Sequence, residues 1–269
     1  MLKTTRVLAT SAVAVTLLVT TVAANHSWGT YHWARTANPV KLQIGDNVSG
    51  AWDAHLDVAI QDWDYPNSGV LDLTKVAGAA AKPRNCRPTS GRIEVCNYRY
   101  GSNGWLGIAQ IWINGDHITQ GTTKLNDTYF NTATYNKPEW RQLVMCQEVG
   151  HDFGLDHQDE NFNNANLGTC MDYTNNPSSN QHPNQHDYAQ LAAIYSHLDT
   201  FTSAGAAKLP SAMPPAMGLI DFETPAQWGK RIHGTANGRE EIYELDFGRG
   251  HRVLTHVFWA DPDADADAH

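Results

Sequence analysis

The segment 145–157, MCQEVGHDFGLDH, carries side chains at a spacing that suits metal-dependent hydrolysis. Gln147 and His151 are four residues apart, so in a helix they lie on one face and can reach one ion. Gly154 permits the left-handed turn that ends a helix, after which the returning chain presents His157. Zinc hydrolysis needs three protein ligands and an open fourth position for water. We therefore predict that Gln147, His151 and His157 bind Zn2+.

Glu148 is the candidate catalytic base of this segment. It lies about 100° further round the helix than Gln147, so its carboxylate can contact a metal-bound water without binding the ion. A zinc ion lowers the pKa of that water toward about 7, and Glu148 then passes the proton to the leaving amine. Four further carboxylates either orient the histidines or are simply exposed: Asp152, Asp156, Asp159 and Glu160.

The run QEVGHDFGLDH resembles the extended zinc signature of the metzincin metallopeptidases, which has a histidine where this chain has Gln147. The later run Cys170-Met171-Asp172-Tyr173 is similar in spacing to the methionine turn of that family. The resemblance implies that Met171 lies beneath the ion without binding it. It also implies that Tyr173 binds the metal and stabilises the oxyanion, as a tyrosine at this position can in the astacin and serralysin branches.

The segments HWAR, PVKLQIG, AIQDW and WIN precede the metal helix in the order of a matrixin-like catalytic domain, and this likeness covers about residues 28–198. Apolar patterns predict four strands before the metal helix: 39–45, 70–76, 93–100 and 105–114. Stripes at helical spacing predict helices at 52–63 and 185–198, and Pro138 opens the metal helix. The expected fold is α/β (α+β), a metzincin-like catalytic domain with a mixed twisted sheet, a long active-site helix and a Met-turn.

The chain divides into five expected parts. A basic start, an apolar stretch and small residues near position 24 predict a signal peptide at 1–24. The metallopeptidase domain follows at 25–200, and a Pro/Ala-rich linker at 201–218. Three short strands predict a small β module at 219–260, which is too short to hold a core alone and should lean on the main domain. Residues 261–269 form an acidic tail.

Charge and cysteine content indicate the compartment and the partners. Four cysteines fit an oxidising compartment and allow three pairings, of which local spacing favours Cys86–Cys96 and Cys146–Cys170. The formal net charge of −9 argues against nucleic acid or an anionic membrane as partner. We expect a secreted, extracellular monomer without stable membrane insertion, which acts on a protein or peptide substrate.

Gln147 leaves a second function open. A neutral amide binds zinc more weakly than an imidazole does, so the alternative is a weak or inactive pseudopeptidase that acts as an extracellular binding protein. The intact Glu148 favours the enzyme. In a further alternative, the C-terminal strands carry a targeting or wall-binding function, and Trp228 and Trp259 are candidates for a carbohydrate-binding strip.

Other polar residues give weaker predictions. Five histidines are candidate substitute ligands: His26, His32, His182, His186 and His197. Asp159, Asn161 and Asn163 are spaced like Ca2+ ligands, but Asn164 stands where a calcium loop needs glycine. We therefore regard calcium as weakly supported.

Overall fold

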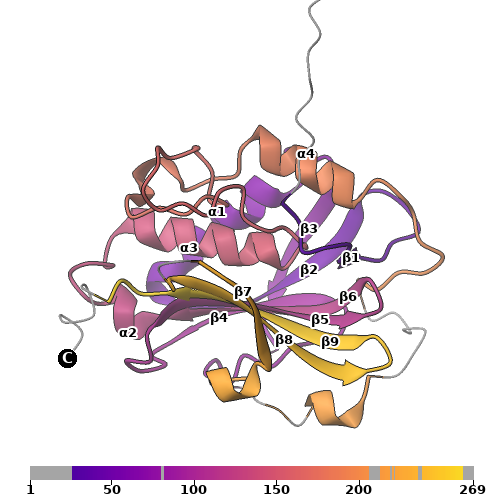
Figure 1. The fold of residues 1–269 in the computed structure, drawn as a ribbon. Helices are drawn as coiled ribbons and strands as arrows, with labels where there is room; N and C mark the ends of the chain where they lie inside the picture. Colours follow the sequence, from indigo (N-terminus) through magenta and orange to yellow (C-terminus); the bar gives the residue numbers. More distant parts are fainter. Residues whose placement is uncertain are drawn as a thin grey trace, which may run out of the picture.

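The computed structural model describes residues 26–79, 82–205, 213–218, 220, 222–235 and 238–262. The predicted signal peptide lies outside these residues, as do part of the predicted linker and most of the predicted acidic tail. The described part forms a mixed α/β structure around one large sheet (Figure 1).

The sheet has nine strands. They are β1 His32–Trp33, β2 Val40–Asn47, β3 Leu71–Ala77, β4 Arg92–Tyr98, β5 Trp105–Asn114, β6 His117–Asn126, β7 Lys230–Gly234, β8 Glu240–Gly248 and β9 His251–Trp259. Their order is β3-β2-β4-β6-β5-β9-β8-β7, with the short β1 beside β6. The first four strands of this order are mutually parallel, and every pairing from β6 onward to β7 is antiparallel.

Three main helices cover one face of the sheet, as Figure 1 shows. These are α1 Asp53–Trp63, preceded by a 3-10 turn at Gly50–Trp52, α3 Pro138–His151 and α4 Gln185–Ile194. The short α2 spans Asp127–Phe130, and 3-10 turns occur at Pro177–Ser179, Pro215–Gly218 and Pro225–Gln227. The last two turns lie against the opposite face of the sheet.

The central strand β5 explains why the sheet needs cover on both faces. Leu106, Ala109 and Ile111 pack into the main core beneath the helices. Trp105 and Trp112 belong to a second hydrophobic cluster on the other face of the sheet. The two C-terminal 3-10 turns cover this cluster. A strand that is apolar on both sides is stable only in such a doubly covered position. The predicted central placement of this strand is confirmed.

The C-terminal strands belong to this same sheet. Strand β9 pairs with the outer edge of β5 over its whole length, from Trp105 opposite Trp259 to Asn114 opposite His251. Strands β8 and β7 then extend the sheet further. Trp228 is fully buried in the second cluster and Trp259 is partly buried, so Trp228 offers no exposed surface for a carbohydrate.

Two parts of the expected fold need correction. Strand β6 was not predicted, because its HITQGTTKLN sequence places polar residues such as Gln120 and Thr123 at buried positions and lacks apolar alternation. The helix expected at 185–198 ends at Ile194, where the hydroxyl of Tyr195 turns inward and donates a hydrogen bond to the carbonyl of Phe153.

Both favoured cysteine pairs form disulfides, Cys86–Cys96 and Cys146–Cys170. The second ties the buried middle of α3 to the segment just before Met171, so it links this helix to the predicted Met-turn. Two disulfides are compatible with an oxidising compartment. In the described part of the chain, no helix combines the length and apolar character needed to cross a bilayer.

Candidate metal centre

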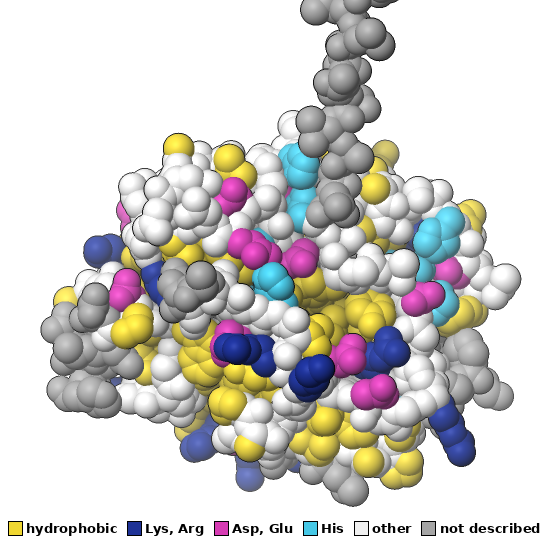
Figure 2. All heavy atoms as spheres, viewed as in Figure 1, with side chains coloured by type: hydrophobic (Ala, Val, Ile, Leu, Met, Phe, Trp, Pro, Cys, Tyr) yellow, Lys and Arg dark blue, Asp and Glu magenta, His cyan; other side chains and the backbone are white. Residues whose placement is uncertain are grey.

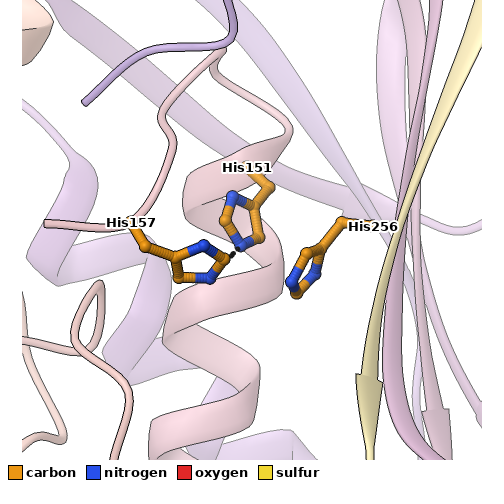
Figure 3. Close-up of side chains that lie close together, drawn as sticks. All are labelled: His151, His157 and His256. Carbon is orange, nitrogen blue, oxygen red and sulfur yellow. Dashed lines mark hydrogen bonds between the residues drawn. The ribbon is translucent and has the colours of Figure 1, made fainter. Parts of the chain in front are cut away.

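Three buried histidines meet between α3 and the sheet. A nitrogen from each of His151, His157 and His256 lies within 4.8 Å of a nitrogen from the other two. Figure 3 shows the three rings turned toward one another, His151 from α3, His157 from the segment after α3, and His256 from β9. Two of the three are residues that the sequence predicted as ligands, and the structure brings these together.

The path between His151 and His157 depends on Gly154. This residue has a φ of +94°, a conformation in which a side chain is strained. A Cβ there would also lie 2.2 Å from the carbonyl oxygen of Tyr31. Glycine therefore lets the chain leave α3 and return within a few residues, which places the Nε2 atoms of His151 and His157 3.1 Å apart.

The ring of His151 is held in a form that can bind metal. Its Nδ1 atom donates a hydrogen bond to the carbonyl oxygen of Leu155 at 2.9 Å, which leaves Nε2 facing His157. Burial, together with the neighbouring His256 and His157, holds the pKa of His151 well below its usual value. A neutral imidazole whose other nitrogen is bonded to a carbonyl is the usual state of a metal-binding histidine.

Glu148 lies beside the cluster and is fully buried. Its Oε2 atom accepts a hydrogen bond from Nδ1 of His256 at 2.9 Å, and its Oε1 atom has no hydrogen-bond partner among the described residues. Burial raises the pKa of Glu148, and the facing His256 opposes that rise only in part. One carboxylate oxygen thus positions a histidine, and the other remains available for a proton.

Glu240 of β8 is a second buried carboxylate at the cluster. Its Oε2 atom lies 2.9 Å from Nε2 of His157 and 3.1 Å from Nε2 of His256. Burial alone would raise the pKa of Glu240, but the two histidines lower it below its usual value. For His256, burial alone would lower the pKa. Glu148 and Glu240 outweigh this effect and raise the pKa of His256 to about 10. Two buried carboxylates therefore favour positive charge at this point, which protons or a divalent cation can supply.

Gln147, the predicted first ligand, lies one helical turn before His151 and is fully buried. Neither its amide oxygen nor its amide nitrogen has a hydrogen-bond partner among the described residues. A buried amide without partners costs about 1–3 kcal/mol of stability. An ion that the amide oxygen could bind would offset this cost, so the observation fits a residue that faces a metal.

The predicted Met-turn lies against the same helix. Met171 is fully buried, and its Sδ atom would lie 2.8 Å from a Cβ built at Gly150, the residue before His151. The ring of Tyr173 packs 4.2 Å from that of His157, measured between centroids. Burial raises the pKa of Tyr173 well above its usual value, and the nearby Glu240 raises it further. Tyr173 therefore keeps its proton beside the cluster.

The remaining predicted carboxylates divide into two groups. Asp156 accepts a hydrogen bond from the backbone of His157, and its Oδ1 lies 3.4 Å from Nδ1 of that ring. Asp152 is buried but bonds to Thr123. Asp159 and Glu160 contact Asn161 and His233 respectively. Of these four carboxylates, only Asp156 thus has an orienting contact with a cluster histidine.

None of the substitute histidines is a member of the cluster. His182 pairs with Asp62 at 2.7 Å, and His26 stacks on His186 with ring centroids 4.8 Å apart. His32 and His197 form a separate cluster near the surface. The third nitrogen of the cluster comes instead from His256, a residue that the sequence analysis did not select.

One signal in the sequence could have identified His256. Leu254 and Phe258 on the same face of β9 pack into the main core, and His256 interrupts this apolar row. A histidine in a row that faces a core usually has a polar partner or a ligand. Glu240 lies at the first position of β8 and has no comparable sequence signal.

A small cavity adjoins the cluster. It has a volume of about 230 Å3 and is lined in part by Trp28, Asp156, Ile242 and Leu254. The ring of Trp28 lies between this cavity and the cluster, because it stacks on His151 with centroids 4.8 Å apart. The three histidines themselves are buried.

No protein-family model matches this chain, and no curated protein sequence matches it at a significant level.

Proposed function

We propose that the protein is a secreted zinc-dependent endopeptidase with a metzincin-like catalytic domain. The observation that carries the proposal is the buried group of His151, His157 and His256 with Glu148 directly beside it. Three imidazoles suit zinc, and a buried carboxylate next to them is the arrangement that metal-assisted hydrolysis requires. Gln147 remains a proposed ligand, because its amide is buried without a hydrogen-bond partner among the described residues. It would take the place of His256 rather than add to the three imidazoles, so that a fourth position stays open for water.

A bound zinc ion would polarise the scissile carbonyl and lower the pKa of a coordinated water. Glu148 would hold the proton released in this step on Oε1, and its raised pKa favours that role at neutral pH. While β9 is in place, Oε2 of Glu148 holds His256 through the hydrogen bond to Nδ1. The protonated hydroxyl of Tyr173 would donate to the developing oxyanion.

Substrate entry requires the C-terminal strands to move. An extended peptide would add to the sheet edge above the metal, and in this structure β9 occupies the outer edge of β5. The cluster is buried, and one of its members, His256, comes from β9. We therefore propose that this arrangement is a closed form, and that displacement of β7–β9 withdraws His256 and gives an active form in which Gln147, His151 and His157 hold the ion.

The alternative function has a specific observation in its favour. Glu240 of β8 and His256 of β9 lie on the side of the cluster that substrate would approach. A metal ion enclosed in this way would be structural, and the protein would be an inactive pseudopeptidase that acts as an extracellular binding protein.

Cleavage of a casein-type substrate by the zinc-loaded full-length protein separates the two functions. The endopeptidase should cleave, should lose activity with a chelator and regain it with zinc. Its Glu148→Gln variant should keep zinc and lose about 100-fold or more in rate, because the proton acceptor is gone. Equal cleavage by the wild type and Glu148→Gln would exclude the proposed mechanism, and zinc binding without any cleavage would favour the pseudopeptidase.

A further inference from the structure

A second group of histidines lies far from α3 in the chain. His32 at β1, His197 after α4 and Asp199 each offer one atom within 4.8 Å of the other two. The Nε2 atoms of His32 and His197 are 3.2 Å apart. Oδ1 of Asp199 lies 3.4 Å from Nε2 of His32 and 3.8 Å from that of His197.

These separations are close to those that one metal ion imposes. Zinc–ligand bonds of about 2.0–2.1 Å in tetrahedral geometry place neighbouring ligand atoms about 3.3 Å apart. The three observed separations of 3.2, 3.4 and 3.8 Å lie near this value. The group shares no residue with the cluster of His151, His157 and His256.

The orientation of the His32 ring directs Nε2 at the other two groups. Its Nδ1 atom lies 2.7 Å from the carbonyl oxygen of Thr30, which can only accept, so Nδ1 carries a hydrogen. Nε2 is therefore the ring atom that faces Oδ1 of Asp199. A cation between these two atoms, a proton or a metal ion, would stabilise the contact.

The carboxylate of Asp199 is held in a fixed orientation. Its Oδ2 atom accepts a hydrogen bond from the backbone nitrogen of Arg35 at 2.9 Å, which leaves Oδ1 directed at the histidines. His117 contacts the same Oδ1 atom at 3.1 Å and so holds the carboxylate in position.

The site opens to solvent on one side. The side chain of His32 is 4% exposed and that of Asp199 8%, whereas that of His197 is 54% exposed. Figure 2 shows histidine and acidic side chains gathered on the flank where Figure 1 places β1, the beginning of β6 and the segment after α4. An ion could therefore enter without a change in fold, and water could complete its coordination.

We propose that His32, His197 and Asp199 bind a second Zn2+ ion, with His117 as a positioning residue for Asp199. Two imidazoles and a carboxylate favour zinc over the oxygen-preferring Ca2+ and Mg2+. The ion would join the segment before β2 to the segment after α4, which are distant in the chain. Since it binds the folded protein, it should raise the melting temperature.

Zinc content and melting temperature of the full-length protein test this proposal. His197→Ala is the main variant, because this exposed side chain can be removed without disturbing the core. The variant should contain one zinc ion fewer per chain than the wild type and should melt at least about 4 °C lower in the presence of zinc. His117→Ala should keep the site but weaken zinc binding about tenfold.

His182→Ala is the matched control. His182 is also exposed and pairs with one carboxylate, Asp62. Among the described residues, it belongs to neither group of possible metal ligands. Its zinc content and melting temperature should equal those of the wild type. Equal zinc content in His197→Ala and the wild type, or an equal loss in His182→Ala, would overturn the second site. Because the readout is the difference between variants, the result does not depend on whether the first cluster binds zinc.

Discussion

Nδ1 of His256 in β9 donates a hydrogen bond of 2.9 Å to Oε2 of Glu148 in α3, across 108 residues of sequence. Both side chains are fully buried. The contact joins the C-terminal strands to the candidate catalytic base, so these strands form part of the candidate metal centre. Movement of β9 would break this contact, so we expect the position of β9 to control any hydrolysis that depends on Glu148.

His256→Ala should affect both zinc binding and folding. Zinc affinity should fall by about 100-fold or more, since a proposed ligand is lost. In the zinc-free protein, Glu148 and Glu240 would lose a buried positive partner, which should lower the free energy of unfolding by about 3–5 kcal/mol. Zinc titration and urea unfolding measure these effects. His233→Ala removes an exposed histidine that pairs with Glu160 and should change neither quantity; an equal effect of both variants would contradict the account.

Gln147→His should tighten zinc binding by on the order of tenfold or more, about 1.4 kcal/mol, because an imidazole is a better zinc ligand than a neutral amide. Competition with a chromophoric chelator measures the affinity. Gln142→His is the matched control on the same helix, where Gln142 is buried but bonds to His55. If Gln147→Ala binds zinc as tightly as the wild type, Gln147 is not a ligand.

A covalent link between β5 and β9 should block hydrolysis without blocking zinc binding. Gln110 and Thr255 are directly opposed, and their side chains share a hydrogen bond of 3.0 Å. A disulfide from Gln110→Cys and Thr255→Cys would hold β9 on the edge of β5. The double variant should lose at least about 90% of casein cleavage relative to each single variant, because the strand could no longer leave. Full activity of the cross-linked protein would refute strand displacement.

Asp187 should make the protein less stable as the pH rises through weakly acidic values. Burial raises its pKa to about 6, although hydrogen bonds from Thr169 and the backbone of Asn184 oppose the rise. Between about pH 4 and 6 the folded state therefore binds more protons than the unfolded state, and stability falls with increasing pH. The full effect is up to about 3 kcal/mol.

Asp187→Asn should remove this dependence, because an amide imitates the neutral acid. Urea unfolding at pH 4.5 and pH 7 would show it, with the variant more stable than the wild type only at the higher pH. A difference between the two proteins that stays the same at both pH values would show that the ionisation of Asp187 does not cause the effect.

The residues from 145 to 173 allowed much of the site to be predicted, because local spacing determines helix faces and turns. Gln147, Glu148 and His151 follow from one helix, and the Gly154 turn places His157 near them. Apolar periodicity likewise predicted β2, α1 and β5. These features depend on neighbours in sequence.

His256 and Glu240 could not be placed in the same way, because their positions depend on the pairing of β9 with β5. Apolar alternation predicts that a strand exists but does not identify its partner. Strand β6 was missed for a different reason. Its buried positions hold threonine and glutamine, which satisfy their polar groups by side-chain hydrogen bonds such as that from Thr123 to Asp152.

Anomalous diffraction at the zinc edge from crystals of the zinc-loaded protein tests the metal centre most directly. The account predicts a zinc peak within bonding distance, about 2.0–2.1 Å, of a nitrogen of His151 and of His157, with His256 in the same coordination sphere. Absence of a peak among these three side chains at saturating zinc would contradict the account, whatever metal is found elsewhere on the protein.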